Sequence, residues 1–296
     1  MTTDETWHVA PLTSRPMIRR MLNQDRAYSA YMLGDLDEPH WKHCSFVGAW
    51  PPGSQPGDPP QALILRYDGF DPALLVVSGS TAGVTAILRL QPVSSSVYFT
   101  ASGPLLPVLE RRYHIPSPAH MWRMALSADA FPGLPDTGEE AVPLTGSKAT
   151  ALLTAFFAGM RQENGNHFSP EQVKDDAFFG IFVDSKLVSV AGTHLVSETE
   201  SVAAVGNIYT LPDYRGRGYA TQCTAATVAS LLERGIQDIV LNVRQDNLTA
   251  IHIYEKLGFR RHVPFWEGMA YSQPPSVDSQ PADGQHRRQG HNPVLK

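Results

Sequence analysis

The chain is poor in cysteine and carries no large excess of charge of either sign. Its 296 residues include two cysteines, Cys44 and Cys223, and the formal net charge is −5. Two cysteines so far apart provide neither a disulfide framework nor the ligand spacing of a metal site, so we expect free thiols and no metal. A weakly acidic chain also lacks the basic surface that attracts nucleic acid, and we expect no such partner.

Long apolar runs are missing as well. No run approaches the ~18 residues that indicate a transmembrane helix, and residues 1–10 lack the basic start and apolar core of a signal peptide. We therefore expect a cytoplasmic protein without membrane contact. Hydrophobic residues make up 42% of the sequence, and the length suits about two globular domains.

Stretches rich in proline, glycine and polar residues divide the chain. Residues 131–143 combine proline, glycine and acids, as interdomain linkers do, and residues 51–60 are typical of a loop between two strands. Residues 272–296 hold too little apolar surface to offset chain entropy, so we expect a disordered tail. The predicted domains are residues 1–130 and 141–271.

Both halves alternate apolar strands with helical patterns, which indicates a mixed α/β layer architecture. The first half is predicted to hold helices at 17–31, 81–90 and 104–113 and strands at 44–50, 62–67, 74–78, 97–102 and 120–126. The second half is predicted to hold helices at 147–161, 218–234 and 248–257, a hairpin over 178–197 that turns at 184–186, and strands at 201–210, 238–243 and 265–271.

An arginine-glycine cluster, Arg215-Gly216-Arg217-Gly218, lies between a predicted strand and a predicted helix. The first turn of a helix leaves backbone N–H groups without internal partners, and the helix dipole adds partial positive charge there. Glycines let the backbone approach a ligand closely, and arginines add charge and forked donors. A pyrophosphate would fit this turn; the alternative is a glycine turn that only connects strand to helix.

Two common phosphate motifs do not match. A P-loop needs four residues between its glycines and then Gly-Lys-Ser/Thr. A dinucleotide fingerprint needs a third glycine, where Thr221 stands here, and an acid at the end of the next strand. That strand is followed by Arg244 and Gln245 before Asp246.

This cluster resembles the cofactor motif of the GNAT superfamily of acyl-CoA-dependent N-acyltransferases, and residues 210–218 look most like the glycine N-acyltransferase branch. A second family motif, an asparagine followed by an aromatic residue and Gly-Phe, matches Asn247, Tyr254 and Gly258-Phe259. The clear resemblance covers residues 142–271. The first half shares only the element order and has Ser-Gly-Ser-Thr-Ala-Gly (78–83) in place of the signature, as in a degenerate copy of a tandem GNAT protein.

The resemblance implies two GNAT-like domains, each a mostly antiparallel mixed sheet flanked by helices, and acetyl-CoA as the co-substrate. It implies that the pyrophosphate of coenzyme A lies at the glycine turn, the pantetheine arm along the preceding strand, and the thioester in a splayed strand pair. Backbone N–H groups of that strand would then polarise the thioester carbonyl. The implied cofactor contacts are Ile208, Tyr209, Thr210, Arg215, Gly216, Arg217, Gly218, Tyr219, Ala220, Thr221 and Asn247.

Tyr254 is the candidate acid that protonates the departing thiolate. It follows Asn247, a predicted N-cap, by seven residues, so both fall on one helix face. The alternative for Tyr254 is a core aromatic residue that packs with Ala250 and Leu257. A tyrosine and a thiol have ordinary pKa values near ~10 and ~8.5, so the transfer needs help from geometry or environment.

A general base is not evident. Asn242 stands where some relatives carry a glutamate, and an amide does not accept a proton usefully. His194, Glu198 and Glu200 lie near in sequence; His194 is the best of them, although a strand histidine is more often structural, and a water can carry the proton instead. Trp266 and Glu267, or the acidic helix end at 31–37, are further options for the acceptor site.

Two functions fit the sequence. The first is an N-acetyltransferase that acts on the primary amine of a small molecule, an amino acid or a peptide N-terminus in a ternary complex, as a monomer or homodimer. A weak base favours an amine of low pKa: an α-amine has a pKa of ~7.7–8.0, against ~10.4 for a lysine side chain. The second is a non-catalytic module that binds acyl-CoA as a sensor or scaffold.

Overall fold

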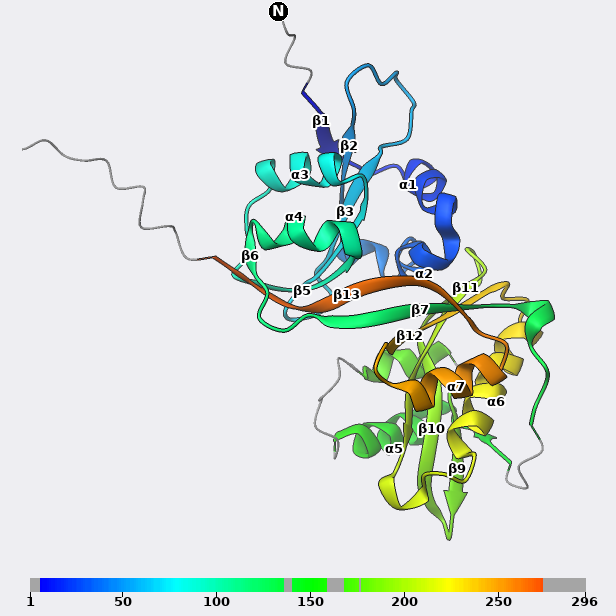
Figure 1. Cartoon of the computed structure of the whole chain (residues 1–296). Helices are drawn as coiled ribbons and strands as arrows, with labels where there is room; N and C mark the ends of the chain where they lie inside the picture. Colours follow the sequence, from blue (N-terminus) through cyan, green and yellow to red (C-terminus); the bar gives the residue numbers. More distant parts are fainter. Residues whose placement is uncertain (1–5, 136–139, 159–167, 176, 274–296) are drawn as a thin grey trace, which may run out of the picture.

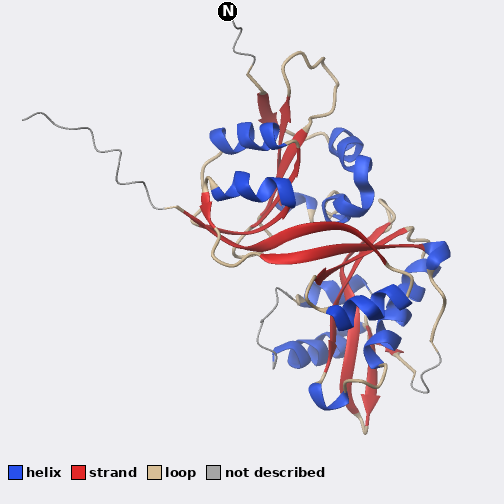
Figure 2. Ribbon diagram, viewed as in Figure 1, coloured by secondary structure: helices blue, strands red, loops and turns tan. Residues whose placement is uncertain are grey.

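The computed structural model describes residues 6–135, 140–158, 168–175 and 177–273. Their strands join into one mixed sheet that runs through both halves, with helices on its faces (Figures 1 and 2). The strand order is β1-β2-β3-β4-β5-β13-β7-β12-β11-β10-β9-β8, and β6 pairs with β13. Two of the described pairs, β4–β5 and β11–β12, are parallel, and the others are antiparallel. A mostly antiparallel mixed sheet flanked by helices is thereby confirmed.

The two halves follow the same order of elements. Each begins with a strand and a helical stretch, continues with three strands, and then alternates helix, strand, helix and strand. The elements of the first half are β1 His8–Pro11, α1 Arg15–Leu22, α2 Arg26–Gly34, β2 Cys44–Trp50, β3 Ala62–Tyr67, β4 Leu74–Gly79, α3 Thr81–Leu90, β5 Ser96–Ser102, α4 Leu106–Glu110, β6 Tyr113–His114 and β7 Ala119–Ser127. Those of the second half are β8 Val142–Pro143, α5 Gly146–Ala158, the 3-10 helix η5 Pro170–Asp175, β9 Phe179–Val183, β10 Lys186–Ser197, β11 Val202–Thr210, α6 Tyr219–Glu233, β12 Asp238–Arg244, α7 Leu248–Lys256 and β13 Arg260–Ser272.

The last strands of the two halves are exchanged. Strand β7 ends the first half, yet it pairs with β12 and β13 of the second. Strand β13 ends the second half, yet it pairs with β5 of the first. In Figure 1 the two strands run side by side across the middle of the molecule, between the two groups of helices. The sequence predicts both strands but not this pairing, because alternation of apolar residues does not name a partner strand.

Several predicted boundaries differ from the structure. The helix predicted at 17–31 is two helices, because Asp25 accepts a hydrogen bond from the backbone N–H of Tyr28 and so begins α2 as a new helix. The helix predicted at 104–113 is shorter, since Tyr113 pairs with Ser272 in the sheet. Strand β13 therefore extends into the predicted tail, whose residues from 274 onward lie outside the described part, as do 159–161 of the predicted helix at 147–161.

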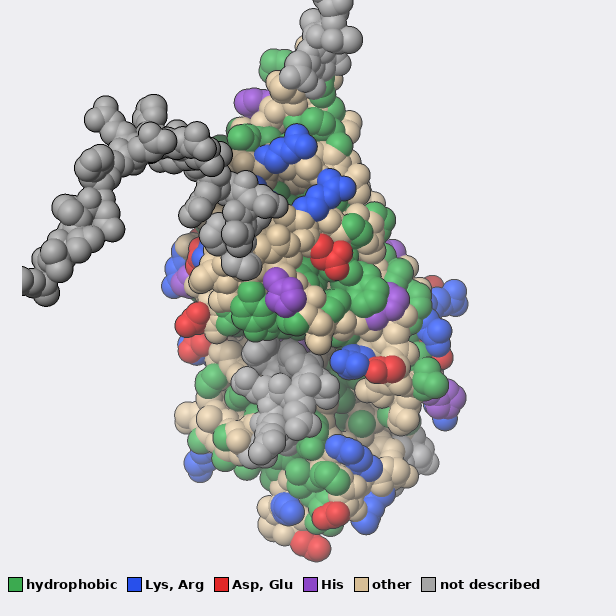
Figure 3. Space-filling view, turned by 60° about the vertical axis from the view of Figure 1, so that its left-hand side comes forward, with side chains coloured by type: hydrophobic (Ala, Val, Ile, Leu, Met, Phe, Trp, Pro, Cys, Tyr) green, Lys and Arg blue, Asp and Glu red, His purple; other side chains and the backbone are tan. Residues whose placement is uncertain are grey.

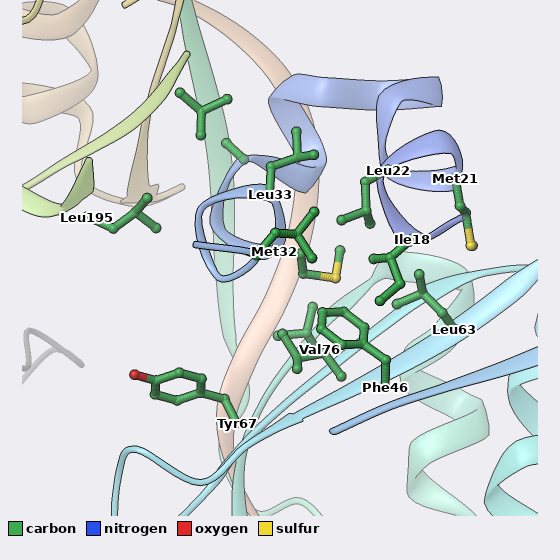
Figure 4. Packing of buried hydrophobic residues seen from close by; sticks show 14 of the residues in the cluster. Ile18, Met21, Leu22, Met32, Leu33, Phe46, Leu63, Tyr67, Val76 and Leu195 are labelled. Atoms are coloured by element: carbon green, nitrogen blue, oxygen red, sulfur yellow. The ribbon is translucent and has the colours of Figure 1, made fainter. Parts of the chain in front are cut away.

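A hydrophobic cluster joins the first half to the second. It brings α1, α2, β2 and β3 together with Leu195 of β10 (Figure 4). Leu33 and Leu195 are both buried, and a Cβ on Gly34 would stand 2.0 Å from Leu195 Cδ1, so α2 meets β10 closely at that point. Helix α2 consequently packs on the second half as well as on the first, and it forms one wall of the junction behind β11 and β12.

Candidate active site

Strands β11 and β12 separate halfway along their length. They pair in parallel from Val202 with Asp238 to Val205 with Leu241. Beyond that point they no longer pair with each other, although β11 continues to Thr210 and β12 to Arg244. The sequence resemblance implied a splayed strand pair, and the register shows one here. The opening lies in the parallel strand pair of the second half.

A bulge in β11 begins at this opening. Val190 of β10 faces Tyr209 and Gly192 faces Gly206, so Asn207 and Ile208 together stand opposite Ala191. Asn207 has a φ of +52°, which is left-handed for a residue with a side chain. Its buried Nδ2 donates to Thr193 O and Gln172 Oε1, both at 3.0 Å. These bonds hold the strained backbone, and the bulge frees strand amides from regular pairing.

The N-terminus of α6 lacks a side-chain cap. Gly218 is its N-cap with a φ of +82°, and Gly216 has a φ of +76°. The N-caps of α3 and α7 contrast with it: Ser80 accepts from the N–H of Gly83, and Asn247 accepts from the N–H of Ala250. In α6 the first-turn N–H groups thus have no such side-chain acceptor in the described structure, and they can serve a ligand. The predicted N-cap role of Asn247 is confirmed.

One cleft of about 1020 Å³ runs from the glycine turn through the strand opening to α7. Of the residues implied as cofactor contacts, all but Arg217 line it, and so does Tyr254. Arg215 lines the cleft and donates to Thr210 O at 3.1 Å. Arg217 instead lies over the ring of Tyr214, 5.3 Å from its centroid, and donates to Asp213 O. The remaining lining residues are Met121, Thr154, Phe157, Ala158, Phe168, Pro170, Tyr214, Asn242, Val243, Arg244, Thr249, Ala250 and Ile253.

Tyr254 is buried at the wall of this cleft. Its ring meets Phe259 edge-on with centroids 6.2 Å apart. Burial raises the pKa of its hydroxyl above the ordinary value, so the group is protonated at neutral pH. The residue therefore belongs both to the core and to the cleft, and it presents a hydrogen-bond donor rather than a charge.

The residues considered as a general base do not line the cleft. His194 Nδ1 lies 2.9 Å from Tyr31 Oη, on the face that α2 covers. Glu198 is exposed and pairs with Arg234, and Glu200 is buried in an ion pair with Arg19. The acidic end of α2 also lies away from the cleft lining, and burial raises the pKa of its Asp35 to about 7.

Trp266 and Glu267 lie on β13, also outside the cleft lining. Trp266 stacks on His120 with ring centroids 4.1 Å apart. Glu267 is buried on the strand face shared with Arg123, where burial raises its pKa to about 7 and a hydrogen bond from Tyr98 opposes that shift. Neither residue touches the space that the cofactor motif surrounds.

Sequence reasoning missed the contribution of β7. Met121 lines the cleft, and Arg123 donates from Nε to Asn242 Oδ1 at 2.6 Å. Arg123 is only 5% exposed. An arginine within the apolar strand pattern at 120–126 was a signal, because a charge in a buried strand requires a polar network around it. The aromatic wall of α5 and η5, Phe157 and Phe168, was missed too, since its position depends on the fold.

Two further observations bear on cofactors and surroundings. In residues 6–135, 140–158, 168–175 and 177–273, no group of three or more His, Cys, Asp or Glu is placed to hold a metal. None of the helices described is long and apolar enough to cross a membrane. On the face drawn in Figure 3, acidic and basic side chains are interspersed.

Residues 150–259 match the family model "Acetyltransferase (GNAT) family". These residues are similar to a GNAT acetyltransferase domain, and they are called the GNAT domain below. The GNAT domain holds the glycine turn, the strand opening and Tyr254, while Met121 reaches its cleft from the first half. The description of the family model and the names of the relatives below are those of acetyltransferases.

Two relatives that match part of the chain are named acetyltransferases. A mycothiol acetyltransferase of Rhodococcus jostii is 32% identical over 93 residues, which cover 30% of each chain. An N-alpha-acetyltransferase 30 of Schizosaccharomyces pombe is 36% identical over 95 residues, which cover 32% of this chain and 59% of that one. The chain thus spans less than two thirds of either relative.

A solved structure of a Drosophila melanogaster protein resembles almost the whole chain. Its TM-score is 0.64 at 12% identity, and the match covers 89% of this chain and 98% of that one. At this identity the likeness concerns the fold alone. It extends beyond the GNAT domain, so the arrangement of both halves recurs in another protein.

Proposed function

We propose that this chain transfers the acetyl group of acetyl-CoA to the primary amine of a small molecule, an amino acid or a peptide N-terminus, by direct attack in a ternary complex. One observation carries the proposal. A single cleft joins the uncapped N-terminus of α6, the opening between β11 and β12, and Tyr254. A nucleotide thioester needs these three features in this order: an anion site, a channel for the arm, and a donor at the sulfur.

The residues present fit coenzyme A. First-turn N–H groups of α6, from Tyr219 to Thr221, together with Arg215 hold a pyrophosphate, and Gly216 and Gly218 let it approach the backbone. The free edge of β11, Ile208 to Thr210, pairs with the amides of the pantetheine arm. Asn247 lines the same wall at the start of α7. Acetyl-CoA, when bound, supplies an activated thioester.

The chain's own groups would then assist the attack. Backbone N–H groups freed at the bulge of Asn207 and Ile208 stabilise the negative charge that develops on the carbonyl oxygen. Tyr254, kept protonated by burial, donates to the departing sulfur. Its raised pKa makes it a weak acid, so its contribution comes from position and hydrogen bonding.

The acceptor is best an amine of low pKa. Among the described residues that line the cleft there is no aspartate, glutamate, lysine or histidine, and the charged ones are Arg215 and Arg244. Such a site offers little help in removing a proton, and it offers no counter-ion to a cation. An α-amine, with a pKa of ~7.7–8.0, is already about a tenth neutral at pH 7, whereas a lysine side chain at ~10.4 is not. The name of the fission-yeast relative, N-alpha-acetyltransferase, agrees with this choice.

We further infer that residues 1–130 are a degenerate GNAT-like domain without a cofactor site of its own. Strands β4 and β5 pair from Leu74 to Val77 and show no comparable opening, and Ser80 caps α3 with its own side chain. The Ser80 cap uses a first-turn N–H group of the kind that α6 leaves without a side-chain acceptor. The likeness of the glycine turn to glycine N-acyltransferases stays a prediction.

The test is acetyl transfer itself. The purified full chain is incubated with acetyl-CoA and a panel of amino acids, amino acid amides, short peptides and alkylamines, and free thiol and acetylated amine are both measured. Transfer to α-amines above the hydrolysis rate supports the proposal. Tight binding of acetyl-CoA without transfer to any amine would favour the alternative, a sensor or scaffold, which the lack of a carboxylate among the described cleft residues also favours. Lysine acetylation at the same rate as α-amine acetylation would overturn the preference.

A further inference from the structure

Asn242 stands where the cleft meets the junction of the two halves. It follows Leu241, the last residue of β12 that pairs with β11, so it lies at the point where the strands begin to separate. It lines the cleft. It also faces Arg123 across the β7–β12 pair, on the side of the sheet that α2 covers. The residue therefore connects the reacting end of the cleft with the first half.

The orientation of the Asn242 amide is decided by its partner. Arg123 Nε lies 2.6 Å from Oδ1, and a guanidinium only donates hydrogen bonds. The oxygen must therefore point to Arg123, and the Nδ2 hydrogens point away from it. Nothing in the described part of the protein accepts a hydrogen bond from Nδ2. The cleft thus has a fixed, unused donor at this position and no acceptor.

Arg123 cannot easily move away from this position. Nη1 donates to Tyr28 O at 2.7 Å and to Ala27 O at 3.3 Å, both at the start of α2. The guanidinium carbon lies 4.7 Å from the ring centroid of Tyr31 and 5.3 Å from that of Phe265. Burial lowers its pKa, but an arginine with a usual value above 12 stays charged. A buried cation is consequently fixed directly behind Asn242.

A donor backed by a fixed cation favours oxygen ligands. A carbonyl or carboxylate oxygen accepts from Nδ2 and is stabilised by the positive charge, whereas an ammonium group is repelled by the charge and has no acceptor here. Met121 and the stacked rings of Phe157 and Phe168, 4.7 Å apart, line the same cleft without a charge. Asn242 and Arg244 are thus the polar side chains that β12 contributes to the cleft.

We propose that Asn242, oriented by Arg123, recognises the oxygen on the carbon next to the acceptor amine, so the site selects α-amino carbonyl compounds, namely amino acids, their amides and peptide N-termini, over plain amines. The inference rests on the proposed acetyl transfer. In that arrangement the arm runs back from the glycine turn along Thr210 to Ile208, which leaves the reacting carbon beside the strand opening and Asn242. An amine that attacks there has its neighbouring oxygen within reach of Nδ2. Asn242 is a binding residue, and Arg123 is a positioning residue.

The experiment uses two small amines whose pKa values are both lowered, one by a carbonyl and one by fluorine. Glycinamide carries the oxygen, and 2,2-difluoroethylamine does not. Initial rates of acetyl transfer by the full chain are expressed per concentration of neutral amine, which removes the difference in protonation. We expect kcat/KM to favour glycinamide by roughly tenfold to hundredfold, as for a buried donor that finds or loses its partner.

Two variants then test the residue. Asn242→Asp exchanges the donor for a carboxylate that pairs with Arg123, and Asn242→Ala removes the group. Both should bring the ratio of kcat/KM for glycinamide to that for 2,2-difluoroethylamine close to one, and both should leave the KM for acetyl-CoA unchanged. Arg123→Lys should weaken the preference in the same way, with the same unchanged KM. Gln245→Ala is the matched control, since Gln245 is an amide just beyond β12 that donates to Met121 O and does not line the cleft.

Each outcome decides the point. Equal use of both amines by the unaltered chain, or a preference that survives in Asn242→Asp, overturns the inference and leaves the acetyltransferase proposal intact. If neither amine is acetylated, the two N-acetyl products are titrated by NMR into the protein saturated with coenzyme A. Tighter binding of N-acetylglycinamide that is lost in Asn242→Asp supports the inference, and equal binding rejects it. Absence of coenzyme A binding would instead reject the proposed function.

Discussion

Arg19 of α1 and Glu200, 181 residues apart in the sequence, form an ion pair with two oxygens at the junction of the halves. The Glu200 side chain is 3% exposed and that of Arg19 is 37% exposed. The backbone N–H of Glu200 also donates a hydrogen bond to Ser197 Oγ. The Glu200 carboxylate is thus buried behind an arginine that is partly exposed to water, so its charge depends on Arg19 for compensation.

Arg19→Ala should destabilise the chain by about 1–3 kcal/mol, because it leaves a buried carboxylate without its partner. Equilibrium urea unfolding followed by tryptophan fluorescence measures this. Arg20→Ala is the control on the same helix, since Arg20 is exposed and makes one long bond to Gly57 O; its effect should stay within about 0.5 kcal/mol. Equal effects of the two substitutions would show that Glu200 gains nothing from Arg19.

Tyr254→Phe should lower the turnover of acetyl transfer by roughly 10²-fold or more while the affinity for coenzyme A stays the same. The change removes one hydroxyl and keeps the ring that packs against Phe259. Steady-state kinetics and calorimetric titration of coenzyme A give the two quantities. A turnover within a factor of two of the unaltered chain would remove Tyr254 as the acid.

Gly218→Asp should weaken coenzyme A binding by about tenfold or more, since it places a carboxylate at the uncapped N-terminus of α6. Gly235→Asp is the matched control at the other end of the same helix. The φ of Gly235 is +80°, close to the +82° of Gly218, so the backbone strain is alike in both variants. Affinity measured at low ionic strength should fall in the first variant alone; a similar loss in both would mean that strain, and not charge, is responsible.

Glu267→Gln should stabilise the chain at alkaline pH. The folded-state pKa of Glu267 is raised from an ordinary 4.5 to about 7, so the folded state binds its proton more tightly than the unfolded state. The stabilisation of the folded state by this proton is complete below about pH 4.5 and is lost as the pH rises to 7 and above. One pKa unit corresponds to ~1.4 kcal/mol. Between pH 5 and pH 8 the free energy of unfolding of the variant should therefore rise by up to about 3 kcal/mol relative to that of the unaltered chain. Urea unfolding at both pH values tests this, and a difference that does not change with pH contradicts it.

The local backbone geometry of the candidate site could be predicted from the sequence. Glycines at 216 and 218 between a strand and a helix indicated an anion-binding turn, and the structure shows both with positive φ at the open end of α6. The spacing of Asn247 and Tyr254 placed both on α7, and both line the cleft. Such features depend on neighbours within a few residues, where backbone geometry and hydrogen-bond donors are fixed by the residue types.

The contacts between the two halves could not be predicted from the sequence. The exchange of β7 and β13, the pairing of Arg123 with Asn242, and the burial of Glu267 each join residues more than a hundred positions apart or depend on such a contact. The alternation of apolar and polar residues in a strand shows which of its faces is buried. It does not show which other strand pairs with it, so many strand pairings agree with the same pattern. The sequence by itself determined the glycine turn, the two motif helices and the alternation of strands and helices. Only the tertiary structure decided that a strand of the first half contributes to the cleft. That arrangement depends on the packing of the two halves against each other and on the hydrogen bonds of the buried Arg123.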